Sequence, residues 1–485
     1  MKGIAQIYHY VGGMIMEKKP TCIEKVMSKS IGLKRTMSTN AAVMVGVGGT
    51  IGTGLFLSSG DVISTAGPGG AIIMYLIGGL IMYLMTSCLG ELSAAMPVSG
   101  SLQAFSTEFI NPAMGFTIGW VNWTGGAVTI TTQLVASAII MRDIIPNSPT
   151  WMWILIFAVV LFGVNFLDAK KFGDVSFVAS SLKIIMIVGF IIVGAALVFG
   201  IGPNEAIGMS NYTQHGGLFP AGLAGMGAVT LTSFYAYAGT EVVASTAGEL
   251  KDEGKISKMI NLTMIILVGA TVLSIAVVAA ILPWDSADLS GSPFVYAFRE
   301  VGLDGAALLV NIIVLSSALT SGNYFTYANA RYIWSMAKFN QAPKIFAKTS
   351  KSGVPWVGLT VSMAFALFGV LAEVFAPDTV YKVLVWYIGG ANIFMYSVIC
   401  ICQYRFRKRY IAEGGKVEDL PYRVISFPLV PIAGVASFAI MLIVTIMDPG
   451  ERIAMAFCAV CYIAMYIAAH FYTKKHDVTA INIDL

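Results

Sequence analysis

Residues 46–56 read Gly46-Val47-Gly48-Gly49-Thr50-Ile51-Gly52-Thr53-Gly54-Leu55-Phe56. Five glycines fall within nine residues of a segment that is otherwise apolar enough to cross a bilayer. Because each interior glycine costs a helix about 1 kcal/mol relative to alanine, this run predicts a helix that stops and restarts inside the membrane. Lipid tolerates unwound backbone only where protein or a water-filled cavity covers its polar groups. Broken helices of this kind are typical of secondary transporters.

The composition of the whole chain indicates an integral membrane protein. Of its 485 residues, 57% are hydrophobic and 12% are charged, and the mean hydropathy is +0.78. A bilayer requires about 20 apolar residues per helix, so the expected fold class is all-α with about twelve transmembrane helices. The apolar runs predict these helices at residues 40–58, 70–95, 114–140, 151–167, 176–199, 224–247, 261–282, 304–333, 356–375, 380–403, 426–446 and 453–472.

Basic residues are distributed unevenly over the predicted loops. When successive loops are assigned to alternate sides of the membrane, 25 of the 30 Lys and Arg residues fall on the side of the two termini. Four fall on the other side, and Lys183 lies inside a span. The positive-inside rule then predicts a multi-pass protein of the cell (inner or plasma) membrane with both termini in the cytoplasm. Because the basic residues are scattered over loops, no nucleic-acid partner is expected.

A second interruption falls in the sixth predicted span, which reads Phe234-Tyr235-Ala236-Tyr237-Ala238-Gly239-Thr240-Glu241. Both interruptions end in Gly-Thr, at 52–53 and at 239–240. With five spans per half the second half must run inverted to the first, which predicts a LeuT-type 5+5 inverted repeat. The predicted parts are a cytoplasmic N-terminal tail (1–38), the first five-helix repeat (39–200), the second five-helix repeat (201–404), a cytoplasmic loop with two peripheral C-terminal helices (405–472) and a cytoplasmic C-terminal tail (473–485).

Several motifs occur in the order that one known family shows. They are Gly48 through Phe56, Leu89-Gly90-Glu91-Leu92 with Pro97-Val98-Ser99-Gly100, Gly119-Trp120, Gly239-Thr240-Glu241 with Ala247-Gly248-Glu249, Arg331 through Ala337, Ala342-Pro343 and Gly353-Val354-Pro355. Over roughly residues 35–445 the chain resembles the amino acid–polyamine–organocation (APC) superfamily, in particular its amino acid transporter (AAT) family of bacterial permeases. The resemblance implies transport of an amino acid by alternating access.

The helix ends at the two interruptions have the polarity that an α-amino acid requires. Helix N-termini offer free N–H groups and a positive dipole end to a carboxylate, and helix C-termini offer free carbonyls to an ammonium group. The amides expected to bind the substrate carboxylate are those of Gly52, Thr53 and Gly54. The carbonyls expected to bind the ammonium are those of Ile51, Tyr235 and Ala238, and the resemblance implies the same assignment. The alternative is that these glycines only allow two helices to cross closely.

Three side chains are candidates for the gate and the side-chain pocket. Tyr235 and Tyr237 flank the second interruption, where an aromatic residue resembles the family's gating position; the alternative is that both are ordinary core aromatics. Permeases of this family that prefer cations commonly carry an acid in the third span, where this chain has Gln133. A buried cation without its counter-ion loses several kcal/mol, so Gln133 favours neutral substrates. The eighth predicted span is about three residues longer than in the family pattern, so the family's pocket residues are not assigned to positions in this span.

Two charged residues lie within apolar spans and are candidates for proton coupling. Lys183 could extend its long stem to the membrane surface, or it could point into the bundle beside the first and eighth helices. Burial disfavours the charged form of an amine, so an inward-pointing Lys183 is a candidate proton carrier, and the resemblance implies that role. Glu241 begins the restarted half of the sixth helix, where it could couple a proton or organise the unwound segment.

These features predict a secondary active transporter that imports an amino acid, preferably a neutral one, with a proton as the coupling ion. No other cofactor and no metal is expected, and the oligomeric state is left open. An enzyme is not expected, because no metal-ligand cluster, nucleophile elbow or phosphate loop is present in the sequence. The first alternative is a permease or exchanger of cationic amino acids. A remote alternative is a transporter-like membrane sensor, although sensors usually carry a longer soluble segment.

Overall fold

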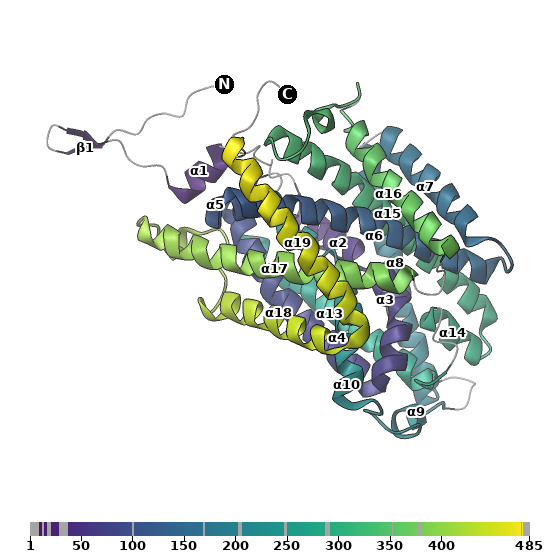
Figure 1. Ribbon diagram of the computed structural model, residues 1–485. Coiled ribbons are helices and arrows are strands. Elements are labelled where there is room, and N and C mark those ends of the chain that lie inside the picture. Colours follow the sequence, from purple (N-terminus) through teal and green to yellow (C-terminus); the bar gives the residue numbers. More distant parts are fainter. Residues whose placement is uncertain are drawn as a thin grey trace.

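The chain is a bundle of helices (Figure 1). The computed structural model describes residues 9–11, 14–16, 21–28, 37–98, 101–167, 170–201, 206–246, 250–286, 292–351, 353–375, 380–476 and 478. Eight helices of these ranges are long and apolar enough to cross a bilayer, and two shorter apolar helices accompany them at Thr150–Phe166 and Trp356–Leu371. The predicted all-α class of the membrane body is therefore confirmed, while the count of twelve crossings stays a prediction.

Each predicted span falls on observed helix. The long helices are α4 (Ser58–Ala95), α6 (Pro112–Ile144), α7 (Thr150–Leu167), α8 (Lys170–Phe199), α13 (Ile256–Ile281), α15 (Asp304–Lys338), α16 (Trp356–Phe375), α17 (Val380–Ala412), α18 (Leu429–Met447) and α19 (Pro449–Lys475). Helix α4 is kinked at Gly67, whose φ of +75° is a conformation that favours glycine, and Pro68 follows it. This kink separates the first predicted span from the second.

The first and sixth spans are interrupted where the sequence predicts. The first consists of α2 (Thr39–Thr50) and α3 (Thr53–Phe56), which are separated at residues 51–52. The sixth consists of α10 (Gly222–Gly227), α11 (Thr230–Tyr235) and α12 (Glu241–Thr246). Between α11 and α12 the chain turns through Gly239, which has a φ of +98°.

The two interrupted helices cross in antiparallel directions with their backbones in contact. A Cβ atom at Gly54 would lie 2.7 Å from the Cα atom of Ala236, and one at Gly239 would lie 3.1 Å from the carbonyl oxygen of Gly49. At one end of the bundle the N–H of Lys251, just beyond α12, donates to the carbonyl of Met37, just before α2, at 3.0 Å. An inverted repeat requires this antiparallel approach; the 5+5 repeat and the domain limits remain predictions.

Several short elements were not predicted from the sequence. They are the antiparallel strands β1 (His9–Val11) and β2 (Met14–Met16) and the helices α1 (Cys22–Ser28), α5 (Ser101–Phe109), α9 (Ser210–Thr213) and α14 (Pro293–Glu300). The N–H of Cys22 donates to Glu413 Oε2 at 2.7 Å. Part of the predicted N-terminal tail therefore packs on the end of α17. Figure 1 shows α1 at one end of the bundle and α9 and α10 at the opposite end.

A buried ion pair joins α4 to α17. Glu91 is fully buried and Arg407 is 4 % exposed. The guanidinium of Arg407 binds both oxygens of the Glu91 carboxylate, which also accepts hydrogen bonds from Gln403 Nε2 (2.9 Å) and from the N–H of Val424 (2.6 Å). The pair therefore holds two helices and the segment before α18 together.

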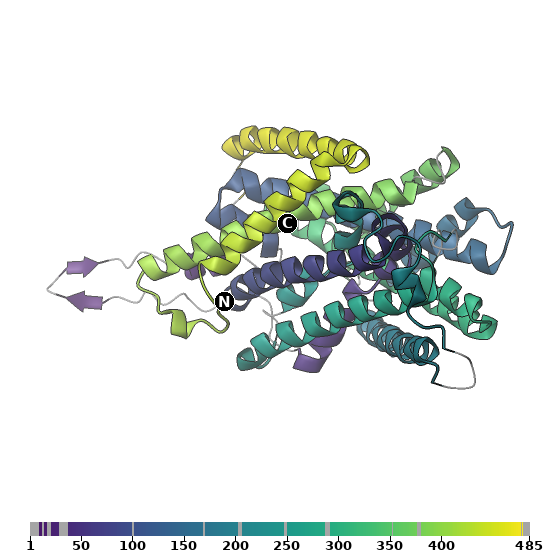
Figure 2. The ribbon, with the colours of Figure 1, turned by 90° about the horizontal axis from the view of Figure 1, so that it is seen from below.

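The outer surface of the bundle is apolar. Helices α18 and α19 lie along one outer side (Figures 1 and 2) and expose side chains such as Ile443 and Val460. Large exposed apolar surfaces of this kind mark contact with a membrane or with another protein. The two interruptions lie inside the bundle, since Ile51 and Ala236 are only 2 % and 5 % exposed.

Candidate functional site

The carbonyls at the end of α2 are bound by the side chain of Lys183. Its Nζ atom donates to the carbonyls of Gly48 (2.9 Å) and Ile51 (3.1 Å) and to Ser321 Oγ on α15 (3.3 Å). The hydroxyl of Ser317, also on α15, donates to the carbonyl of Ile51 at 3.2 Å. A carbonyl oxygen has two lone pairs, so the Ile51 carbonyl is fully engaged within the protein in this conformation.

The position of Lys183 distinguishes the two orientations that the sequence left open. The side chain is 2 % exposed, and it points from α8 into the bundle toward α2 and α15 rather than toward the membrane surface. Its three acceptors are neutral oxygens, and a positive charge beside the carbonyls at a helix C-terminus is favourable. Lys183 therefore links three helices at the first interruption.

The start of α3 is the uncapped side of the same interruption. Gly52 is the N-cap residue of α3, and no side chain caps it. The hydroxyls of Thr53 and Tyr235 lie 3.1 Å apart. Gln133 also lies here, because its Nε2 is 3.4 Å from where a Cβ of Gly52 would be. The Oε1 atom of Gln133 is buried and has no hydrogen-bond partner within the described chain.

At the second interruption a side chain binds the start of the later helix, whereas at the first a side chain binds the end of the earlier helix. Glu241 begins α12, and its Oε2 accepts hydrogen bonds from the N–H of Gly239 (3.1 Å) and from the hydroxyl of Tyr396 on α17 (2.6 Å). The carbonyl of Tyr235, where α11 ends, accepts the N–H of Ala238 at 2.9 Å and so keeps one lone pair. In the described part of the chain no group donates to the carbonyl of Ala238.

A cavity of about 170 Å³ adjoins the second interruption. Its walls come from α5, α6, α12, α15 and α17, and its lining residues are Ser101, Leu102, Asn122, Gly125, Gly126, Thr129, Ala238, Gly239, Glu241, Val242, Tyr324, Phe325, Ala328, Asn329, Tyr332, Ile388, Asn392 and Met395. Of the predicted site residues, this lining includes Ala238 and Glu241. The other predicted residues lie at the first interruption or in the packed core.

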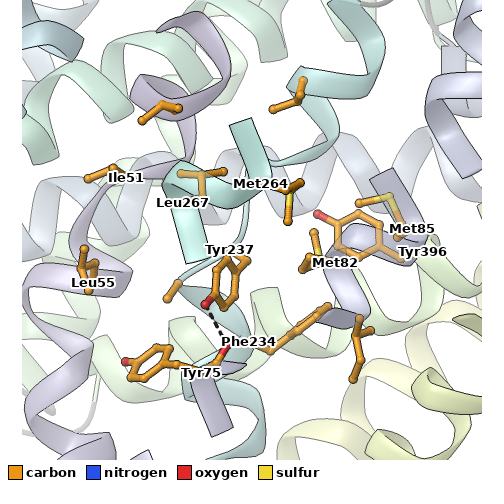
Figure 3. Packing of buried hydrophobic residues seen from close by; sticks show 14 of the residues in the cluster. Ile51, Leu55, Tyr75, Met82, Met85, Phe234, Tyr237, Met264, Leu267 and Tyr396 are labelled. Carbon is orange, nitrogen blue, oxygen red and sulfur yellow. Dashed lines mark hydrogen bonds between the residues drawn. The ribbon is translucent and has the colours of Figure 1, made fainter. Parts of the chain in front are cut away.

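The two tyrosines of the second interruption point in different directions. Tyr235 reaches the first interruption through Thr53, whereas the hydroxyl of Tyr237 donates to the carbonyl of Tyr75 on α4 at 2.8 Å (Figure 3). Residues two apart on a helical turn point about 200° apart, so both cannot face one pocket. Tyr237 packs in the core in this conformation, which matches the alternative interpretation of that residue.

Several residues of the site were not anticipated from the sequence. Besides Ser317, Ser321 and Tyr396, they include Tyr381 on α17, whose hydroxyl lies 3.0 Å from Ser58 Oγ. Each is a polar residue within an apolar helix, and such residues usually face the interior of the bundle. That rule would have selected them as a group, but their partners depend on how the helices are rotated.

Comparison with known proteins gives one family. A family model described as "Amino acid permease" matches residues 41–481. The chain is 39% identical to the amino-acid permease RocE of Bacillus subtilis (strain 168), over 92% of this chain and 96% of the relative. It is 35% identical to the lysine-specific permease LysP of Escherichia coli (strain K12), over 89% and 88% of the two chains. It is 32% identical to the histidine permease HisP of Lactococcus lactis subsp. cremoris (strain MG1363), over 93% and 97%. The chain therefore belongs to the amino acid permease family of the APC superfamily and is a multi-pass membrane protein.

Proposed function

We propose that this permease imports an amino acid together with a proton by alternating access, with both termini in the cytoplasm. The observation that carries the proposal is the occupancy of the four helix ends at the two interruptions. Lys183 binds the end of α2, and Glu241 binds the amide before α12. The other two helix ends, which are the uncapped start of α3 and the end of α11, remain available to a substrate. These two ends offer amides and carbonyls, which are the groups that the carboxylate and ammonium of an amino acid require.

The proposed assignment of the backbone groups follows from this occupancy. The amides of Gly52, Thr53 and Gly54 bind the substrate carboxylate. The ammonium binds the carbonyl of Ala238 and the remaining lone pair of the Tyr235 carbonyl. The Ile51 carbonyl, which the sequence also suggested, binds the ammonium only if Lys183 or Ser317 releases it.

Lys183 is the proposed proton carrier. A protonated lysine donates three hydrogen bonds, whereas a neutral amine donates two and accepts one. Loss of the proton would therefore change the contacts that join α2, α8 and α15, and it would favour a different arrangement of the bundle. Glu241 is the second candidate carrier, since it lies at the other interruption beside the cavity.

Neutral substrates are the proposed class, because Gln133 rather than an acid lies beside Gly52. The second candidate is a permease for cationic amino acids. Two observations favour it: Glu241 is the carboxylate that lines the cavity, and the relatives include proteins named as lysine and histidine permeases. A cationic side chain would then extend from the second interruption toward Glu241.

Uptake into proteoliposomes made from the purified protein tests these proposals. Uptake should follow an inward proton gradient, collapse with a protonophore and be unaffected when potassium replaces sodium. Neutral amino acids should compete better than lysine or arginine, and Gln133→Glu should shift the preference toward lysine by roughly tenfold, about 1.4 kcal/mol. Stronger competition by lysine in the unmodified protein would favour the second candidate, and dependence on sodium would exclude the proton as the coupling ion.

A further inference from the structure

A second hollow lies on the lipid-facing side of the bundle. Helices α4 and α13 form a groove of about 760 Å³ that is lined mainly by apolar side chains. Two of them, Leu80 and Ile265, are 62 % and 70 % exposed. In a bilayer these residues contact hydrocarbon, because both helices are long and apolar enough to span it. The groove is therefore an apolar site filled by the surrounding medium rather than by water.

One end of the groove is polar. The hydroxyl of Tyr83 donates to Oδ1 of Asn261 at 2.9 Å, and both residues line the groove. Lys258 lies one turn before Asn261, on the same helix face, and its side chain is exposed. Charge and hydrogen-bonding groups thus occur where α13 begins, whereas the opposite end of the groove, around Gly269, is apolar.

The groove together with the turn that carries Lys258 matches half of a bilayer in length. On α13 the groove is lined from Asn261 to Gly269, which is about 12 Å at 1.5 Å per residue, and the turn back to Lys258 brings the total to about 16 Å. The hydrocarbon of one leaflet is about 15 Å thick, half of the usual 30 Å. We propose that the groove binds one phospholipid of the leaflet on the side where α13 begins, with an acyl chain between α4 and α13 and an anionic headgroup at Lys258.

The groove is close to the second interruption. A Cβ atom at Gly79, which lines the groove, would lie 3.2 Å from the hydroxyl of Tyr237 and 2.5 Å from Val268. Tyr237 belongs to the segment 236–240, which joins α11 to α12. Only Gly79 therefore separates an acyl chain in the groove from the segment between α11 and α12. The proposed lipid binding does not depend on which substrate the protein transports.

The test uses phosphatidylglycerol that carries a photoreactive diazirine on its acyl chain, in phosphatidylcholine proteoliposomes that contain the full chain. After irradiation, mass spectrometry should find the label concentrated in residues 76–83 and 261–269. Gly269→Leu should remove this labelling, because a Cβ atom there has no neighbour within 4 Å and the larger side chain fills the groove without a clash. Gly189→Leu, at an equally open glycine of α8, is the matched control and should leave the labelling unchanged.

A second variant tests the headgroup end. Lys258→Gln should lower the preference for phosphatidylglycerol over phosphatidylcholine by about fivefold, the factor that one lysine contributes near an anionic surface, while the labelled residues stay the same. Labelling spread evenly over α18 and α19, or labelling that Gly269→Leu leaves intact, would overturn the proposal. It would also be overturned if a second copy of the chain covered the groove: both segments would then escape the label, and Ile265→Cys would form disulfide-linked dimers that the parent chain does not form.

Discussion

At the first interruption a lysine from another helix binds the carbonyls where α2 ends, whereas at the second interruption a glutamate of the restarting helix binds the amide where α12 begins. Each charge has the sign that the helix end favours: a cation at a C-terminus and an anion at an N-terminus. The contact partners also differ, since Lys183 holds α15 and Glu241 holds α17. The two interruptions are alike in backbone but are stabilised by different neighbours. Substitutions at Lys183 and at Glu241 therefore disturb different helix contacts and can be compared directly.

The largest effect is expected where the two interruptions touch. Gly54→Ala places a methyl group 2.7 Å from the Cα atom of Ala236, and overpacking against backbone costs about 1–3 kcal/mol. Substrate binding should fall roughly 10–100-fold, while the protein still reaches the membrane. Gly49→Ala is the matched control, because a Cβ atom there has no neighbour within 4 Å. Equal binding by the two variants would show that close contact at Gly54 is not required.

The next effect concerns the lysine of the first interruption. Lys183→Ala should remove the dependence of uptake on an imposed pH gradient and leave slow exchange, because no titrating group then joins α2 to α15. Lys183→Arg should also lose this dependence, since a guanidinium group stays protonated. Uptake into proteoliposomes at several imposed gradients measures both variants. If Lys183→Ala still follows the gradient, the proton is carried elsewhere, and Glu241 becomes the preferred candidate.

The glutamate of the second interruption should give a contrasting result. Glu241→Gln keeps an oxygen to accept the hydrogen bonds from Gly239 and Tyr396, so uptake of neutral amino acids should keep its dependence on the gradient. Glu241→Ala leaves those two buried donors unpaired and should destabilise the protein by about 1–3 kcal/mol, visible as a lower melting temperature. A selective loss of lysine binding in Glu241→Gln would favour the cationic candidate.

The smallest effects are expected at Tyr235 and Tyr237. Comparing the two variants distinguishes a tyrosine of the substrate site from a tyrosine of the packed core. Tyr235→Phe removes the hydroxyl that faces Thr53 and should weaken substrate binding about fivefold, near 1 kcal/mol for one hydrogen bond. Tyr237→Phe removes the bond to Tyr75 and should lower the melting temperature with no change in affinity. Titration of both variants by thermal shift makes the comparison. The reverse pattern would assign the pocket role to Tyr237.

Much of the fold follows from local sequence. Each predicted span falls on helix, since hydropathy over about 20 residues is a property of the segment itself. Both interruptions were predicted because glycine lowers helix stability wherever it lies. The amphipathic helices α5 and α14 were missed, since eight or nine residues carry a weaker periodic signal than a full span. The contacts within the site were predicted less completely, because local sequence did not indicate that Ser317 donates to the Ile51 carbonyl or that Tyr237 donates to the Tyr75 carbonyl.

The sequence by itself determined that this chain is a helical membrane protein, where its first and sixth spans break, and to which family it belongs. These depend on residue types within short windows and on motifs in a fixed order. Only the tertiary structure decided which helix ends are already occupied, that Lys183 meets Ile51 and Ser321, and that a lipid-facing groove lies between α4 and α13. The physical reason is that a contact between distant residues depends on the rotation and crossing of packed helices, which no single segment specifies.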